Sequence, residues 1–127
     1  MNKKIFCIFA CLILFAGIFA GCKGKLDPNV MMVREGTLNM NPNVPVGKAF
    51  DQFFANGKWE SFTSTEGKTV VEFNGRCQWY NNPADFRIQF DVKGEEFEIW
   101  YVSLNGQQLS MIEGVGVVGK VLSEYRP

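Results

Sequence analysis

The chain has no histidine among its 127 residues, so the side chains that could do chemistry are its cysteines and carboxylates. Histidine activates serine and cysteine nucleophiles and is the side chain that titrates near neutral pH. It is also a common zinc ligand. Its absence argues against a Ser-His-Asp or Cys-His nucleophile and against a His-ligated zinc site.

The carboxylates form two groups. Glu95, Glu96 and Glu98 cluster on one turn and strand, and Asp85 and Asp91 share a strand face. Paired carboxylates hydrolyse glycosidic bonds only when they flank a substrate cleft, and a domain this small has little room for one. Calcium-loop and glycine-rich phosphate-loop patterns are both missing from the sequence. We therefore interpret these carboxylates as a solvated strand face and predict no enzyme, cofactor or metal site.

Residues 1–21 are typical of a targeting segment. Met1–Lys4 is short and positive, and Ile5–Ala20 is a continuous apolar run without a charge. Such an order is typical of a signal peptide. A helix that spans a bilayer needs ~20 apolar residues, slightly more than this run provides. We expect cleavage, with an uncleaved membrane anchor and ordinary secretion as the alternatives.

The segment ends with Phe19, Ala20 and Gly21 directly before Cys22. This pattern resembles the lipobox of bacterial lipoproteins, in which an apolar residue and two small residues precede the cysteine. Phe19 stands where leucine is commonest in that family. The resemblance implies cleavage between Gly21 and Cys22 and lipid on Cys22. Two or more acyl chains anchor a protein stably to a membrane.

The resemblance also implies in which membrane the protein is anchored. Lipoproteins retained in the inner membrane commonly have aspartate just after the lipidated cysteine, but Lys23 follows Cys22 here. This implies the periplasmic face of the outer membrane if the host has one. We predict a signal peptide over 1–21, a lipidated cysteine and tether over 22–29, and one domain over 30–127. The extended polar tether reaches roughly 25 Å, so the domain is expected near the membrane.

Net charge limits the classes of binding partner, and the cysteine count limits the possible disulfides. The chain has 13 basic and 13 acidic side chains, and loss of Lys3 and Lys4 with the leader makes it slightly acidic. Nucleic acid is therefore not expected as a partner. Once Cys22 is lipidated, Cys77 is the one cysteine left in the domain, which excludes an internal disulfide. We interpret Cys77 as a small buried apolar residue, the alternative being a reactive or intermolecular thiol.

Hydrophobic periodicity predicts the elements that position these side chains. A helix is expected over 46–54, where apolar residues recur at helical spacing, ending at Asn56-Gly57. Val30–Val33 is predicted as a short strand and Asn39–Pro45 as a loop. Strands are predicted over 58–63, 69–80, 84–92 and 96–104, separated by turns. A second helix is predicted in the tail from its 4-3-4-3 spacing, on the residues Met111, Val115, Val118, Leu122 and Tyr125. The predicted fold is α+β: an antiparallel sheet of about four strands with an N-terminal and a C-terminal helix packed on one face.

Strand alternation predicts what the other sheet face presents. If Phe73 and Trp79 face the core, Tyr80 faces outward. If Phe97, Ile99 and Tyr101 face the core, Trp100 and Val102 face outward. The outer face is then expected to carry a protein-binding set of aromatic and charged residues: Tyr80, Trp100, Arg76, Arg87 and Glu98. Aromatic residues with arginine are typical of binding hot spots. The alternative is that the C-terminal helix or a bulge covers one of the aromatic residues.

Several short motifs resemble a group of small uncharacterised bacterial envelope domains, over roughly residues 30–105. They are Gly47-x-Ala49-Phe50-Asp51-x-Phe53-Phe54, Lys58-Trp59-x-x-Phe62, Gly67-x-x-Val70-Val71-Glu72-Phe73-x-Gly75 and Ile88-Gln89-Phe90. These are core and turn residues, so the resemblance implies a fold and no activity. In layout alone, a lipid anchor before helices and a small antiparallel sheet, the chain is also similar to SmpA/OmlA-type lipoproteins.

Together these patterns predict a non-enzymatic, membrane-anchored envelope lipoprotein that binds a protein partner near the membrane, as an assembly accessory or inhibitor. A small-molecule or cell-wall-glycan binding domain is the first alternative. A phage or plasmid exclusion lipoprotein is the second.

Overall fold

The computed structural model describes residues 27–127, so Cys22 and the predicted signal peptide lie outside the described residues. The elements follow one another as α1 (Pro28–Glu35), α2 (Val46–Phe53), β1 (Ala55–Thr63), β2 (Thr69–Trp79), β3 (Asn82–Lys93), β4 (Glu96–Leu104), β5 (Gln107–Gln108) and α3 (Met111–Ser123). Within residues 27–127, none of the helices has the length and apolar character needed to cross a membrane.

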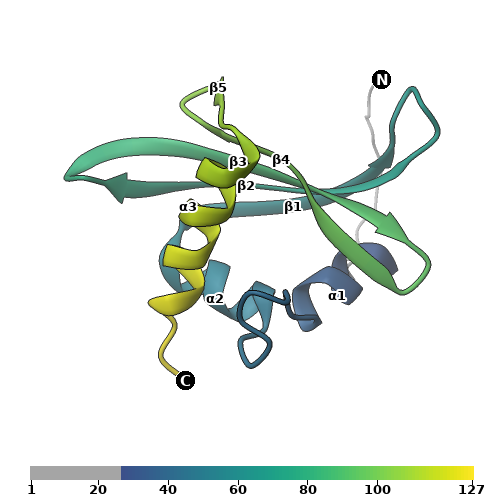
Figure 1. The fold of residues 1–127 in the computed structure, drawn as a ribbon, viewed down its shortest axis with the longest axis horizontal. Coiled ribbons are helices and arrows are strands. Elements are labelled where there is room, and N and C mark those ends of the chain that lie inside the picture. The colour runs from purple at the N-terminus through teal and green to yellow at the C-terminus, as the bar shows by residue number, and fades with distance from the viewer. Residues whose placement is uncertain (1–26) are drawn as a thin grey trace, which may run out of the picture.

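The strands form one antiparallel sheet in the order β1-β2-β3-β4-β5, and the helices pack against a single face of it (Figure 1). The predicted α+β class is confirmed. The sheet has five strands instead of about four, because the turn at Asn105-Gly106 folds Gln107–Gln108 back onto the end of β4. Both turn residues have positive φ, 53° and 80°, as a tight two-residue hairpin turn requires.

The first element is a helix, so the predicted strand at Val30–Val33 is wrong. Asp27 caps α1 by accepting hydrogen bonds from the backbone N–H of Asn29 (2.7 Å) and Val30 (3.4 Å). Pro28 occupies the first turn, where its missing N–H costs nothing. Val30 and Val33, three residues apart, are both buried on the core side. A capped start and helical spacing therefore outweigh the β-propensity of valine.

Helix α2 supplies the centre of the core. It ends at Phe53, earlier than the predicted Asn56-Gly57, because Phe54 is already extended and Asn56 belongs to a bulged start of β1. Phe50 is completely buried, with its ring centroid 5.0–6.1 Å from those of Phe54, Trp59, Phe73 and Phe86. This aromatic cluster joins α2 to β1, β2 and β3.

Helix α3 is confirmed, but its buried stripe is only partly the predicted one. Ser110 and Glu113 form a capping box at its start. Val118 and Leu122 are buried as predicted, whereas Met111 and Val115 are exposed. The rest of the buried stripe is Gly114, Val117 and Val121. Relative to the prediction, the helix is rotated about its axis, because Gly114 lies against the side chain of Val102 on β4.

Strand β4 contains a bulge that reverses its alternation. Gln89 pairs with Tyr101 and Phe90 pairs with Ile99, so Trp100 is an extra residue in the ladder. Such a residue exchanges the two faces for everything that follows. Val102 is therefore buried in the core and Tyr101 lies on the opposite face, the reverse of what alternation predicted.

Candidate functional site

The sheet face opposite the helices is uncovered by any element within residues 27–127 (Figure 1). We call it the open face. Strand register and alternation place on it side chains from β1 to β4: Lys58, Glu60, Phe62, Val70, Glu72, Asn74, Arg76, Asp85, Arg87, Gln89, Asp91, Glu98, Tyr101 and Ser103. The bulge residue Trp100 also lies on this face, beside Lys68.

One end of the open face is aromatic. Phe62 is 41% exposed and Trp100 is 38% exposed, yet Val70, which pairs with Phe62, is completely buried. The ammonium of Lys68 lies 5.4 Å from the centroid of the Trp100 ring, a cation–π distance. Two large aromatic side chains thus remain accessible, and one of them, Trp100, lies beside the ammonium of Lys68.

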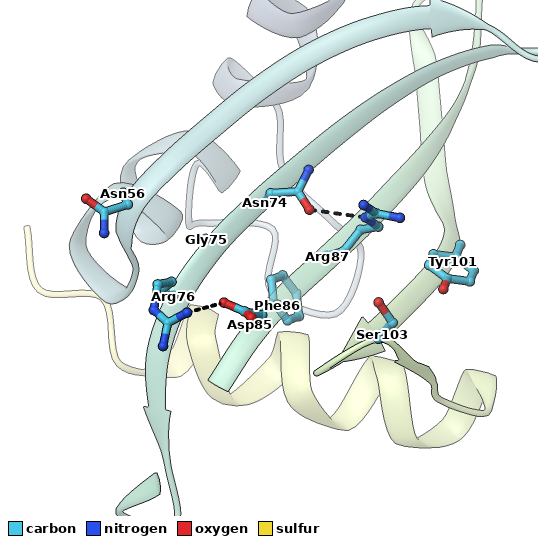
Figure 2. Close-up of a pocket in the computed structure, with 10 residues that line it drawn as sticks. Asn56, Asn74, Gly75, Arg76, Asp85, Phe86, Arg87, Tyr101 and Ser103 are labelled. Carbon is cyan, nitrogen blue, oxygen red and sulfur yellow. Dashed lines mark hydrogen bonds and ion pairs between the residues drawn. The ribbon is translucent and has the colours of Figure 1, made fainter. Parts of the chain in front are cut away.

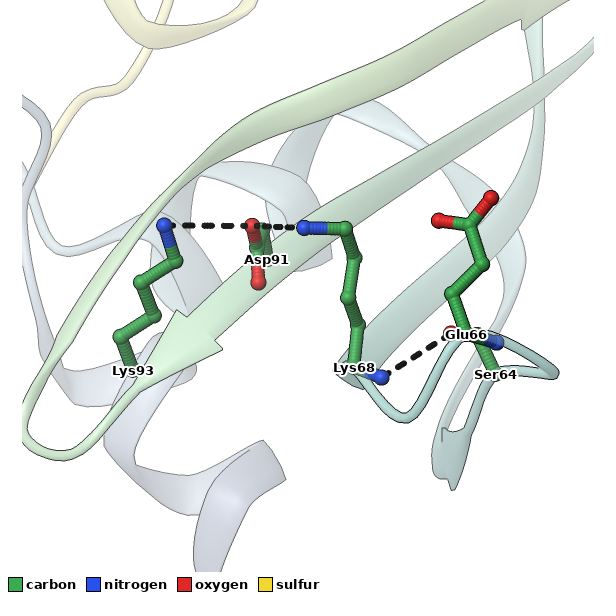
Figure 3. Close-up of polar contacts among 5 residues, drawn as sticks. All are labelled: Ser64, Glu66, Lys68, Asp91 and Lys93. Atoms are coloured by element: carbon green, nitrogen blue, oxygen red, sulfur yellow. Dashed lines mark hydrogen bonds and ion pairs between the residues drawn. The ribbon is translucent and has the colours of Figure 1, made fainter.

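A buried carboxylate holds that cation in place. Asp91 is 5% exposed, and its Oδ2 lies 3.4 Å from Nζ of Lys68 and 3.9 Å from Nζ of Lys93 (Figure 3). The hydroxyl of Ser64 accepts hydrogen bonds from the backbone N–H of Glu66 and Lys68, which orders the turn between β1 and β2. A buried charge is tolerated when it is paired in this way.

The other end of the open face is a polar hollow with a volume of about 550 Å³ (Figure 2). Its polar side chains are Asn56, Asn74, Arg76, Asp85, Arg87, Tyr101 and Ser103. Arg76 Nη1 lies 2.6 Å from Asp85 Oδ1, and Arg87 Nε donates to Asn74 Oδ1 at 3.1 Å. Both arginines are half exposed. A guanidinium has five N–H donors, so each keeps donors available to a ligand.

Glu72 contacts two of the side chains that line the hollow, Asn74 and Arg87. It is 7% exposed although it lies on the open face. Its carboxylate accepts hydrogen bonds from Gln89 Nε2 (2.8 Å) and Asn74 Nδ2 (2.9 Å), and Arg87 Nε lies 3.9 Å from it. Because this buried charge is fully engaged by its neighbours, it fixes the orientation of the Asn74 amide and the Arg87 guanidinium.

The structure brings together some of the predicted binding residues and separates others. Arg76 and Arg87 both line the hollow. Glu98 is the strand neighbour of Asp91 in the β3–β4 ladder, near the aromatic end. Tyr80 is elsewhere: it is a turn residue with φ 51° at the tip of the β2–β3 hairpin and is 85% exposed. Trp100 is level with Glu72, and the strand from Glu72 to Tyr80 extends roughly 25 Å. The expectation of one patch containing Tyr80 and Trp100 is wrong.

Two aromatic residues of the open face, Phe62 and Tyr101, were missed from the sequence. Phe62 alternates with Lys58 and Glu60, so its outward direction could have been recognised. Tyr101 could not, because the bulge at Trp100 that turns it outward leaves no pattern in the sequence.

Cys77, the cysteine within residues 27–127, is not an activated thiol. Cys77 is half-buried on the core side of β2, and burial raises the pKa of its thiol, with Arg76 opposing and Asp85 adding to the shift. A raised pKa leaves the protonated, unreactive thiol at neutral pH. No cluster of three or more metal-ligating side chains occurs within residues 27–127.

No protein-family model, curated protein or solved structure matches this chain. Support for a function therefore comes from the residues of the open face and from the leader pattern before Cys22.

Proposed function

We propose that this protein is a lipid-anchored lipoprotein of the bacterial cell envelope whose open face binds another protein near the membrane, as an assembly accessory or inhibitor. The residues Phe19, Ala20 and Gly21 before Cys22 support lipidation and export. Helix α1 starts at Pro28 with Asp27 as its N-cap, so the tether is shorter than the predicted 22–29, and the segment from Cys22 to Asp27 would reach on the order of 18 Å when fully extended. A partner would thus be met close to the membrane surface, on the periplasmic face of the outer membrane where the host has one.

The observation that carries this proposal is a sheet face that presents both accessible aromatic side chains and arginines and that no helix within residues 27–127 covers. Phe62 and Trp100 lie at one end of the face, and Arg76 and Arg87 lie at the other. Protein interfaces are enriched in aromatic residues and arginine, and their hot spots need such anchors. We propose a non-enzymatic role because the polar groups of the hollow bind one another instead of flanking an activated nucleophile.

In-cell cross-linking of the tagged protein tests the proposal, with detergent extraction of the envelope and identification of what co-purifies. We expect one envelope protein to be captured reproducibly and to be lost on Trp100→Ala or Phe62→Ala. Tyr80→Ala is the matched control, since it truncates an exposed aromatic residue away from the open face and should keep the partner. A Cys22→Ser variant should lose membrane association. Capture that is insensitive to Trp100 and Phe62 would contradict the assignment of the open face.

The polar hollow favours a second candidate, a small-molecule or cell-wall-glycan binding domain. Its volume of about 550 Å³ and its amide, hydroxyl and guanidinium groups suit a polyhydroxylated ligand. Titration with peptidoglycan fragments, followed by calorimetry, should then give saturable binding that Arg76→Ala weakens. Such binding together with no cross-linked partner would replace the first proposal by the second.

A further inference from the structure

The outer edge of β4 is open over most of its length. Strand β5 pairs only with Ser103 and Leu104, and the backbone N–H of Leu109 donates to the carbonyl of Val102 at 2.9 Å. From Glu96 to Tyr101, no strand within residues 27–127 lies on this side of β4. An unpaired strand edge is a template for a further strand.

An apolar groove of about 270 Å³ lies beside this edge, between β4, the loop after α1 and the start of α3. Its apolar lining is Leu38, Met40, Phe97, Ile99, Met111 and Val115. Met40 is 40% exposed and Met111 is 52% exposed. A helix that is apolar on nearly every side, as α3 is, is normally buried all round. Unbranched methionine side chains adapt to varied apolar partners.

The opposite side of the same edge carries two glutamates, Glu96 and Glu98, next to Lys93. Glu96 pairs with Lys93 and Glu98 pairs with Asp91, so both glutamates project toward the open face. A strand added to β4 would direct alternate side chains to the two sides of the sheet. One set would enter the apolar groove, and the other would lie beside Glu96 and Glu98.

We propose that the β4 edge and this groove form a peptide-binding site. Its ligand is an extended segment of a partner protein in which apolar residues alternate with lysine or arginine. Main-chain pairing gives affinity in this mode of recognition, and the alternate side chains give specificity. A second copy of this chain is a poorer occupant, because two β4 edges would bring their glutamates close together. Trp100 and Glu98 belong both to this edge and to the aromatic end of the open face, whereas Val115 lines only the groove and Phe62 lies on β1.

A fluorescein-labelled octapeptide of alternating lysine and valine is the probe, and fluorescence anisotropy with the purified, detergent-solubilised protein is the assay. We expect saturable binding that weakens as salt is raised, since the glutamates are solvent-exposed. Val115→Asp should reduce affinity by about tenfold or more, equivalent to at least ~1.4 kcal/mol. Ile112→Asp is the matched control: it is 87% exposed on the same helix, does not line the groove, and should leave binding unchanged.

Two further probes test strand pairing and charge complementarity separately. A peptide N-methylated at every residue keeps its side chains but has no N–H on either edge to donate to the ladder, and it should not bind. An alternating glutamate–valine peptide should not bind either.

The proposal is overturned if the lysine–valine peptide fails to saturate up to millimolar concentration, or if the N-methylated peptide binds equally well. It is also overturned if Val115→Asp converts a dimer to a monomer in sedimentation, because a second copy then occupies the edge. Phe62→Ala, on the distant strand β1, should leave peptide binding unchanged. The peptide site and the open-face function can therefore fail independently.

Discussion

Two glycines on α3 should respond in opposite directions to the same substitution. A Cβ added at Gly114 would lie 2.9 Å from Cγ2 and 3.0 Å from Cβ of Val102, whereas a Cβ added at Gly116 has nothing within 4 Å. Both positions are inside the helix. We therefore predict that Gly114→Ala destabilises the protein and that Gly116→Ala stabilises it.

The magnitudes follow from two opposing effects. Alanine in place of glycine in a helix interior favours folding by about 0.5–1 kcal/mol, and both variants gain this. At Gly114 the new methyl group must also displace Val102, a stiff β-branched side chain that is only 3% exposed. Overpacking of this kind costs about 1–3 kcal/mol. The net expectation is a loss of about 1 kcal/mol at Gly114 and a gain of about 1 kcal/mol at Gly116.

Urea denaturation and thermal melting of the two purified variants measure the difference. For a domain of this size, 1 kcal/mol corresponds to roughly 4–8 °C in Tm, so the two variants should lie on either side of the wild type. A double-mutant cycle with Val102→Ala should show that this truncation costs less in the Gly114→Ala background. If both alanines shift stability in the same direction by similar amounts, the close approach of α3 to Val102 is refuted.

Three other experiments test separate parts of the structure. Ser110→Ala removes the capping box of α3 and should lower the free energy of unfolding by about 1 kcal/mol in urea titrations; an unchanged midpoint would argue against the cap. Phe50→Ala should cost about 3–5 kcal/mol because its ring is fully buried, whereas Phe62→Ala, on the open face, should cost far less. Burial raises the pKa of the Cys77 thiol, so its alkylation by iodoacetamide, followed by mass spectrometry, should be slower at neutral pH than that of a small model thiol and should keep rising at more alkaline pH. Because the folded-state pKa is the higher one, Cys77 contributes stability that is present below the unfolded pKa and lost as pH rises through the folded pKa. A Cys77 rate profile that coincides with the model thiol would contradict both statements.

Some elements were predictable from the sequence because their signals are local. Strand β3 alternates without interruption from Ala84 to Val92, and a period of two places every side chain on a face. Helix α2 has Phe50 and Phe53 at helical spacing, and Asn105-Gly106 has the residues that a tight turn demands. A local signal was also present at α1, where Asp27-Pro28 is a helix start. The four apolar residues that follow have no period of two or of 3.6 on their own.

The candidate site depended on information that is not local. Arg76 and Arg87 both reach the hollow because the register of β2 and β3 pairs Arg76 with Asp85 and Asn74 with Arg87, two neighbouring positions on the same face. Trp100 and Tyr80 separate because one is at a bulge and the other is in a hairpin turn. Neither feature follows from alternation, which assumes an unbroken strand.

The sequence by itself determined the fold class, most element positions and the leader pattern, because each depends on residues that are neighbours along the chain. The tertiary structure alone decided which side of α3 is buried and which way Tyr101 and Val102 face. An apolar helix has several sides that could be buried, and the contact of Gly114 with Val102 selects one of them. That contact requires Val102 to face the core, and the one-residue bulge at Trp100 is what turns it there.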